Sequence, residues 1–120
     1  GSRALYEVGQ VIQKTVREID IVSRYGGDEF TVILPQTGAE GALTIAERIR
    51  ESIGQQVFLT EFGHNVRITA SFGVSSYPDH GETREDLIQK ADQAMYMVKE
   101  RGKNGVALAM TETCARKGNI

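Results

Sequence analysis

The sequence predicts an α/β fold of the α+β type, in which helices cover a largely antiparallel central sheet. Two observations carry this prediction. Three segments have apolar residues at intervals of three and four, which is typical of amphipathic helices. Between them lie β-branched and aromatic runs that are interrupted by glycine-containing turns. The chain has 120 residues, of which 40% are hydrophobic and 25% charged, a composition that suits one globular domain.

The first predicted elements are a helix over residues 3–17 and a β-hairpin. The apolar stripe of the helix consists of Leu5, Val8, Ile12 and Val16. The runs DIVSRY and EFTVIL follow, separated by Gly26 and Gly27. This predicts a hairpin because glycine adopts positive φ freely at a turn. Asp28 and Glu29 are therefore expected at its tip, and Pro35 ends the second strand because proline cannot donate to a ladder.

A second helix and a second hairpin are predicted in the middle of the chain. The helix covers residues 39–53, with a stripe that consists of Ala42, Ala46, Ile49 and Ile53. Gly54 is expected to stop it. The second hairpin is expected to turn near Gly63, with a return strand through Ile68, Ala70 and Phe72.

A third helix and a last strand complete the predicted domain, which spans residues 1–109. The helix opens with TRED at residues 83–86, a capping box, and ends near Gly102. Its apolar stripe consists of Leu87, Ala91, Met95 and Val98. The strand is GVALAM. Residues 110–120 show neither periodicity nor enough apolar content to pack, so we expect a flexible C-terminal tail there.

Charge and hydropathy exclude several classes of protein. Fourteen basic and 16 acidic residues give a formal net charge of −2, so no overall basic surface would attract nucleic acid. No run approaches the roughly 18 apolar residues of a membrane span, and no charged-then-apolar leader opens the chain. We therefore expect no membrane segment and a cytoplasmic location. The one cysteine, Cys114, has no cysteine partner for a disulfide or a zinc cluster.

The predicted hairpin tip has the groups that hold phosphate and a divalent metal: bare backbone N–H groups and adjacent carboxylates. Neighbouring strand residues face opposite sides, so Asp28 and Glu29 reach one metal only if the turn is distorted. Gly26 and Gly27 permit that distortion and let phosphate approach the backbone. The two glycines follow no Walker or dinucleotide pattern, and a solvated hairpin is the alternative interpretation.

The wider sequence resembles the GGDEF family, the diguanylate cyclases. The resemblance lies in RYGGDEF, in the RxxD spacing of Arg17 and Asp20, in ILPQT, and in ADQAMYMVKERGKN. It implies a nucleotide-cyclase-like fold. Domains of this family begin with a strand and a helix upstream of the position that matches Gly1, so we expect this chain to lack the first strand.

The resemblance implies a reaction and a set of site residues. Two GTP molecules condense to cyclic di-GMP with release of pyrophosphate, in a homodimer that an upstream sensory or receiver domain controls. Asp28 and Glu29 hold Mg²⁺ (or Mn²⁺), with Glu29 also near the attacking hydroxyl. Gly26 and Gly27 contact substrate, and Lys99 and Lys103 bind its phosphates. These two lysines are four residues apart and share one helical face if the last turn of the helix persists. The inhibitory site, which binds the product, consists of Arg17, Asp20 and Arg48.

Several alternatives stay open at this point. Ser2 stands where the family usually has an aspartate that contacts guanine, which either weakens guanine recognition or marks Gly1 and Ser2 as a cloning remnant. A catalytically degenerate domain that only binds cyclic di-GMP is the second functional hypothesis. Lys99 and Lys103 also suit a helix C-terminus, and Arg48 also suits a solvated position beside Glu47. We expect the isolated 120 residues to be inactive alone.

Overall fold

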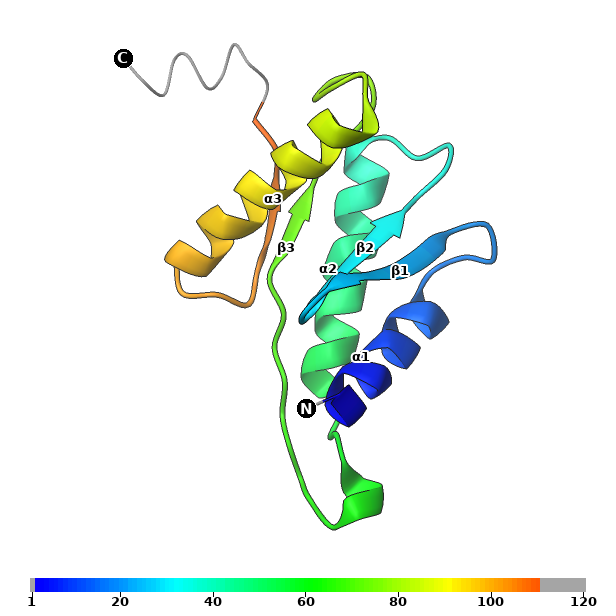
Figure 1. Cartoon of the computed structure of the whole chain (residues 1–120), viewed down its shortest axis with the longest axis vertical. Coiled ribbons are helices and arrows are strands. Elements are labelled where there is room, and N and C mark those ends of the chain that lie inside the picture. Colours follow the sequence, from blue (N-terminus) through cyan, green and yellow to red (C-terminus); the bar gives the residue numbers. More distant parts are fainter. Residues whose placement is uncertain (1, 111–120) are drawn as a thin grey trace.

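The computed structural model describes residues 2–110, which form an elongated domain of helices and short strands (Figure 1). In chain order these elements are α1 (Ser2–Thr15), β1 (Ile21–Gly26), β2 (Glu29–Ile33), α2 (Ala39–Gln55), the 3₁₀ helix η1 (Thr60–Phe62), β3 (Phe72–Val74), α3 (Arg84–Glu100) and β4 (Val106–Leu108). The predicted α/β class is confirmed. The predicted flexible tail lies outside the described residues, apart from Met110. No helix between residues 2 and 110 is both long and apolar enough to span a lipid bilayer.

The strands lie in two separate pairs. β1 and β2 form the predicted antiparallel hairpin, whereas β3 and β4 pair in parallel. Within residues 2–110 no ladder joins one pair to the other. α3 makes the crossover between β3 and β4, as parallel strands require. The prediction of a largely antiparallel sheet thus holds for the hairpin, and the C-terminal strands form a small βαβ unit.

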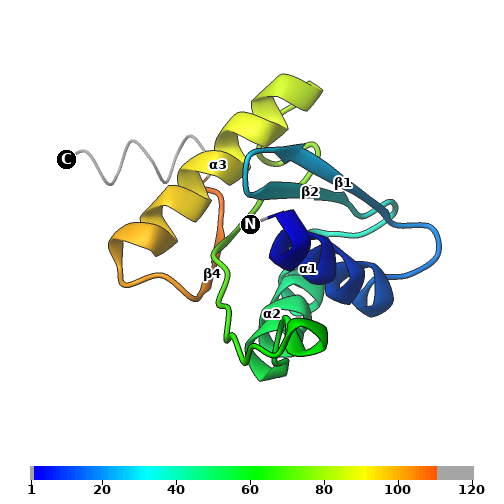
Figure 2. The same ribbon diagram turned by 60° about the horizontal axis from the view of Figure 1, so that its bottom comes forward.

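The hydrophobic core lies between α1, α2 and the hairpin (Figure 2). Its buried centre consists of Val8, Val11, Ile12, Ile49, Ile53 and Phe58. Ile53 and Phe58 have no exposed surface. Val22, Phe30 and Val32 of the hairpin pack against this cluster from one side. All four residues of the predicted α2 stripe are buried, so the 3.6-residue periodicity identified that face correctly.

The prediction that Gly54 stops the second helix is wrong. α2 continues through Gly54 to Gln55, and Gln56 is the first residue with extended backbone, at φ −84° and ψ 145°. The Gln56 N–H donates to the Ile53 carbonyl over 3.3 Å. The chain therefore leaves the helix without a left-handed residue, which removes the need for glycine at that point.

The second predicted hairpin is confirmed only as a turn near Gly63 closed by one antiparallel bridge, and its return strand through Ile68 and Ala70 is wrong. Residues 56–71 contain one antiparallel bridge, between Phe58 and Val66, and the short helix η1. Leu59 is left-handed at φ 62°, and its N–H donates to the Glu7 carboxylate over 3.1 Å instead of to a strand. Ile68 and Ala70 pack on the core without joining a strand, and Phe72 begins β3. Apolar alternation in this segment reflects packing onto the core rather than a ladder.

Both ends of α3 have the expected capping chemistry. The Thr83 hydroxyl accepts a hydrogen bond of 3.1 Å from the Asp86 N–H, as the capping box predicts. At the other end the Lys103 N–H donates to the Val98 carbonyl over 3.0 Å, and Gly102 has φ 115°. This is a Schellman motif, which reverses the chain after Arg101.

β3 packs against α3 at very short range. A Cβ atom on Gly73 would lie 1.8 Å from the Ala91 carbonyl oxygen and 2.6 Å from the Met95 nitrogen. Both of these are backbone atoms, so no side-chain rotation would relieve the clash. Glycine is therefore required here by the close approach of strand and helix.

Candidate functional site

The tip of the β1–β2 hairpin is distorted, as the placement of its two acids requires. Arg24 lies opposite Phe30, but the next pair is Gly26 with Glu29, so Tyr25 is an extra residue in β1. Gly26 has φ 148° and Gly27 has φ 45°. Both angles are unfavourable for residues with a side chain. A glycine bulge therefore ends the ladder and redirects the chain immediately before Asp28.

The side chain of Arg24 closes this bulge. Its Nε and Nη2 atoms donate to the Gly27 carbonyl over 3.1 and 2.7 Å. The guanidinium thus spans the extra residue and holds the turn from the strand side. Sequence reasoning missed this contact, because no side-chain pattern marks the Gly27 carbonyl as a partner for arginine.

Asp28 and Glu29 lie next to each other on the far side of the bulge. Asp28 is in the exposed turn, and Glu29 is the half-buried first residue of β2. Neither carboxylate makes an ion pair or a side-chain hydrogen bond with residues 2–110. No three His, Cys, Asp or Glu side chains converge as a metal site in that part of the chain. Two hard carboxylates still suit Mg²⁺, which usually takes one or two protein carboxylates and completes its shell with water and substrate phosphate.

A pocket of about 370 Å³ lies between α1 and the strands of the hairpin, and none of residues 26–29 lines it. From α1 it is lined by Leu5, Tyr6, Gly9, Gln10 and Gln13, and from the hairpin by Val22, Ser23, Arg24 and Phe30. Its lining combines apolar and polar side chains. Gly9 lets the Phe30 ring approach α1 closely, since a Cβ there would lie 3.2 Å from that ring. Sequence reasoning did not identify this pocket.

Lys99 and Lys103 do not lie on one helical face, so that prediction is wrong. α3 ends at Glu100, with Lys99 in its last turn. Lys103 comes after the Schellman motif and has a left-handed backbone, with φ 67°. The two exposed lysines therefore belong to different backbone elements, and the i, i+4 spacing does not apply to them.

Arg17 and Asp20 form a close ion pair in the turn between α1 and β1. Arg17 Nη2 lies 2.8 Å from Asp20 Oδ1, and Arg17 Nε lies 3.0 Å from Oδ2. The Asp20 side chain is fully buried, whereas that of Arg17 is 44% exposed. Arg17 Nη2 also donates to the Pro35 carbonyl over 3.2 Å and to the Thr37 hydroxyl over 2.6 Å. The pair thus joins the α1–β1 turn to the loop before α2.

Because of this ion pair, part of the folding stability depends on pH. The side-chain hydrogen bond from Arg17 lowers the pKa of Asp20, although burial opposes the effect. A carboxyl group with a lowered folded-state pKa stabilises the protein above its unfolded pKa of about 3.9, and the contribution is lost as the pH falls through the folded value. We therefore expect Asp20→Asn to destabilise the domain clearly at pH 7 and less at pH 3, where the carboxyl group of the unfolded chain is mostly protonated. Urea midpoints at both pH values test this, with the exposed Asp92→Asn as control. Equal losses at the two pH values would contradict it.

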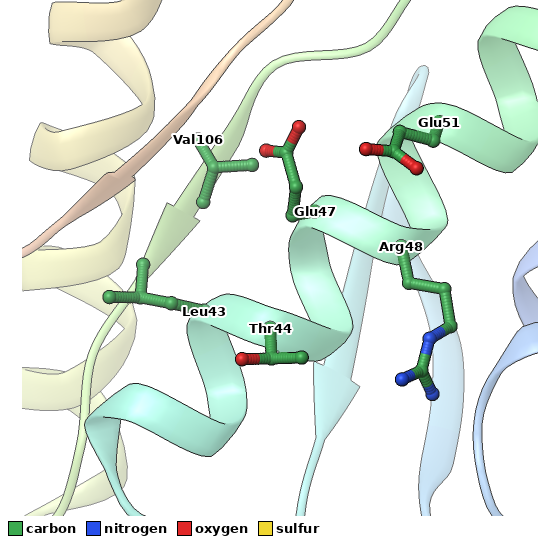
Figure 3. A pocket seen from close by; sticks show the side chains of 6 residues that line it. All are labelled: Leu43, Thr44, Glu47, Arg48, Glu51 and Val106. Carbon is green, nitrogen blue, oxygen red and sulfur yellow. The ribbon is translucent and has the colours of Figure 1, made fainter.

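Arg48 lies on the exposed side of α2, which agrees with the alternative of a solvated position beside Glu47. Glu47 pairs with Arg50, whose Nε donates to it over 2.9 Å, and this hydrogen bond lowers the pKa of Glu47. Arg50 also donates to Asn104 Oδ1 over 3.0 Å. Figure 3 shows Arg48 pointing away from both Glu47 and Glu51. Arg48 thus lines one side of a shallow pocket of about 550 Å³ without an acidic partner on its own helix.

The structure therefore brings some predicted site residues together and separates others. Asp28 and Glu29 share the hairpin tip with Gly26 and Gly27, and Arg17 pairs with Asp20. Lys99, Lys103 and Arg48 lie on other elements. The metal, substrate and product roles of these nine residues stay predictions.

Comparison with known proteins gives a consistent result. The family model described as "Diguanylate cyclase, GGDEF domain" matches residues 1–105. Diguanylate cyclase A of Treponema denticola is 38% identical over 109 residues, which is 91% of this chain and 29% of that protein. The chain thus spans less than a third of this relative.

Solved structures agree with the sequence comparison. The crystal structure of the GGDEF domain of YfiN (TpbB) from Pseudomonas aeruginosa superposes with a TM-score of 0.85 at 34% identity, covering 92% of this chain and 69% of that one. The GGDEF domain of DgcB from Caulobacter crescentus, solved in complex with c-di-GMP, gives a TM-score of 0.78 at 28% identity, covering 88% of this chain and 62% of that one.

Proposed function

Because this chain belongs to the GGDEF family of diguanylate cyclases, we propose that it serves as the catalytic domain that condenses two GTP molecules into cyclic di-GMP. The single observation that supports this best is the glycine bulge at the hairpin tip, which redirects the chain immediately before Asp28 and Glu29. We take residues 1–109 as the domain.

Asp28 and Glu29 are the residues that would hold Mg²⁺ (or Mn²⁺). When bound, this ion supplies charge neutralisation at the phosphates. Gly26 and Gly27 let a phosphate group approach the backbone because no Cβ intervenes. Lys99 and Lys103 add positive charge from α3 and from the loop after it. Glu29 accepts the proton of the attacking hydroxyl. Each 3′-oxygen then forms a bond to the α-phosphorus of the other GTP, and the bond to pyrophosphate breaks.

Catalysis of this kind requires two domains that face each other, each with one GTP. One tip alone presents one pair of carboxylates, whereas two α-phosphates must be attacked. We therefore propose a homodimer as the active form, aligned by an upstream sensory or receiver domain, because alignment of two substrates accounts for much of such a barrier.

The Arg17–Asp20 pair, with Arg48, is proposed as a site for cyclic di-GMP. Arginine pairs and stacks well with guanine. Asp20 already orients the Nε and Nη2 atoms of Arg17, so a ligand would meet a side chain whose conformation is fixed in advance. The DgcB domain that resembles this chain was solved with c-di-GMP, which is consistent with such a site.

A receptor without cyclase activity is the second candidate. It is favoured by Ser2, which stands where the family usually has an aspartate, and by the ordered Arg17–Asp20 pair. In this alternative the chain binds cyclic di-GMP and passes the signal to other domains without making the product.

The two candidates differ in an experiment on the complete gene product. With GTP and Mg²⁺, the first predicts formation of cyclic di-GMP and pyrophosphate, measured by chromatography. Calorimetry with cyclic di-GMP tests the proposed product site at Arg17, Asp20 and Arg48. Arg48→Ala is expected to weaken binding of cyclic di-GMP at least about tenfold, because one charge-assisted contact is lost. Binding without turnover favours the receptor. If the complete gene product shows no turnover and no binding, both proposals are contradicted.

A further inference from the structure

We propose that Arg24 is a positioning residue for the reaction: it holds the bulged hairpin tip that precedes Asp28 and Glu29 in one shape. The inference rests on the function proposed above and adds a residue that acts through the backbone. Arg24 touches neither carboxylate in the described part of the chain. Its contact is with the Gly27 carbonyl, directly before Asp28.

The tip needs such a contact because its own backbone holds it weakly. The ladder shifts between Arg24 and Gly26, and the two glycines that follow have no side chains to pack. A Cβ at either Gly26 or Gly27 would meet no atom within 4 Å, so the surroundings do not confine the turn. Glycine also has the largest conformational freedom of any residue. Two donors from one planar guanidinium restrict the Gly27 peptide in both distance and orientation.

Arginine suits this task better than lysine. Its Nε and Nη2 atoms lie on one rigid edge, and both point at the same carbonyl oxygen. A lysine ammonium keeps the charge but forms no such fork, so the turn would regain rotation about Gly27. The charge near the tip and the geometry of the tip are therefore separable by a single substitution.

The experiment compares Arg24→Lys with a matched control in the complete gene product. Arg67 is also exposed, and it donates to backbone carbonyls, those of Gly54 and Gln55, at the far end of α2. Arg67→Lys removes the same type of contact from a place that is remote from the tip. Thermal unfolding of both variants shows whether each stays folded, and Arg24→Gln replaces Arg24→Lys if that variant unfolds.

The readouts separate positioning from general stability. Arg24→Lys is expected to lower kcat about 10²-fold, the effect of a misplacement of roughly 1 Å, and to raise the Mg²⁺ concentration that gives half-maximal rate. Arg67→Lys is expected to leave both unchanged. Added guanidinium is expected to restore part of the rate of Arg24→Ala and none of the rate of Asp28→Ala.

A readout without turnover distinguishes failure of this inference from failure of the proposed function. Amide NMR shifts of residues 26–29 are expected to change in Arg24→Lys and to stay as in wild type in Arg67→Lys. If the wild type makes no product but these shifts change, the cyclase proposal fails and Arg24 still holds the tip. Two results for Arg24→Lys would overturn the positioning role: unchanged amide shifts of residues 26–29, or changed shifts together with the wild-type rate.

Discussion

Replacing Glu29 by alanine is expected to lower cyclic di-GMP formation by about 10²- to 10³-fold, the usual cost of removing one group that acts on charge in a transition state. The same substitution at Asp28 is expected to act similarly, because both carboxylates are proposed to serve one metal. Asp28 is exposed and Glu29 is half-buried, and neither is paired with residues 2–110, so removal of either leaves no partner unsatisfied. The fold should therefore persist in both variants.

The measurement is initial rate against Mg²⁺ concentration, with circular dichroism as the check on folding. Asp92→Ala, which removes an exposed acid from α3, is the matched control and should retain the wild-type rate. Wild-type rates in both Asp28→Ala and Glu29→Ala would remove the catalytic role of the tip and, with it, the main support for a cyclase.

Gly73→Ala is expected to cause the largest loss of stability among single methyl additions to this domain. The new Cβ would lie 1.8 Å from the Ala91 carbonyl oxygen, so β3 and α3 would have to move apart. Overpacking of a rigid site costs about 3 kcal/mol or more. For a domain of this size that corresponds to a fall in Tm on the order of 10 to 20 °C.

Gly54→Ala provides the opposite expectation with the same chemical change. Gly54 lies within α2, has no atom within 4 Å of an added Cβ, and does not require a positive φ. Alanine is the better helix former by about 1 kcal/mol, so this variant should be slightly more stable than wild type. Differential scanning calorimetry of the two variants tests the contrast. A Tm for Gly73→Ala within about 3 °C of wild type would correspond to a loss of unfolding free energy on the order of 1 kcal/mol or less. Such a small loss would contradict the close packing of β3 against α3.

Local sequence signals predicted those parts of the fold that depend on local chemistry. The Gly26-Gly27 turn, the Thr83 cap and the buried stripe of α2 each follow from a few adjacent residues, and the structure contains all three. A distortion at Gly26 and Gly27 was considered as the condition for both acids to reach one metal, but its place, a bulge at Tyr25, was not predicted. These features need no knowledge of distant contacts.

The signals failed where a distant partner decides the conformation. The strand expected through Ile68 and Ala70 is absent because those side chains pack on a core that α1 and α2 build. The parallel pairing of β3 with β4 was missed, although a helix between two strands is the usual sign of it. The i, i+4 spacing of Lys99 and Lys103 failed because Gly102 ends the helix between them.

Candidate site residues were found by motif, but their contacts were not. The resemblance named Arg17 and Asp20, yet their ion pair and the links to Pro35 and Thr37 appear only in the folded chain. Arg24 was overlooked because its role depends on a backbone carbonyl that no side-chain pattern marks.

The division of the strands into two pairs has a mechanical consequence. Since no ladder hydrogen bond within residues 2–110 connects β2 to β3, the hairpin is held against the rest of the described domain by side-chain packing, through Val22, Phe30 and Val32 on the core. The place of the acidic tip relative to α3 therefore depends on how well this core is packed and not on strand hydrogen bonds.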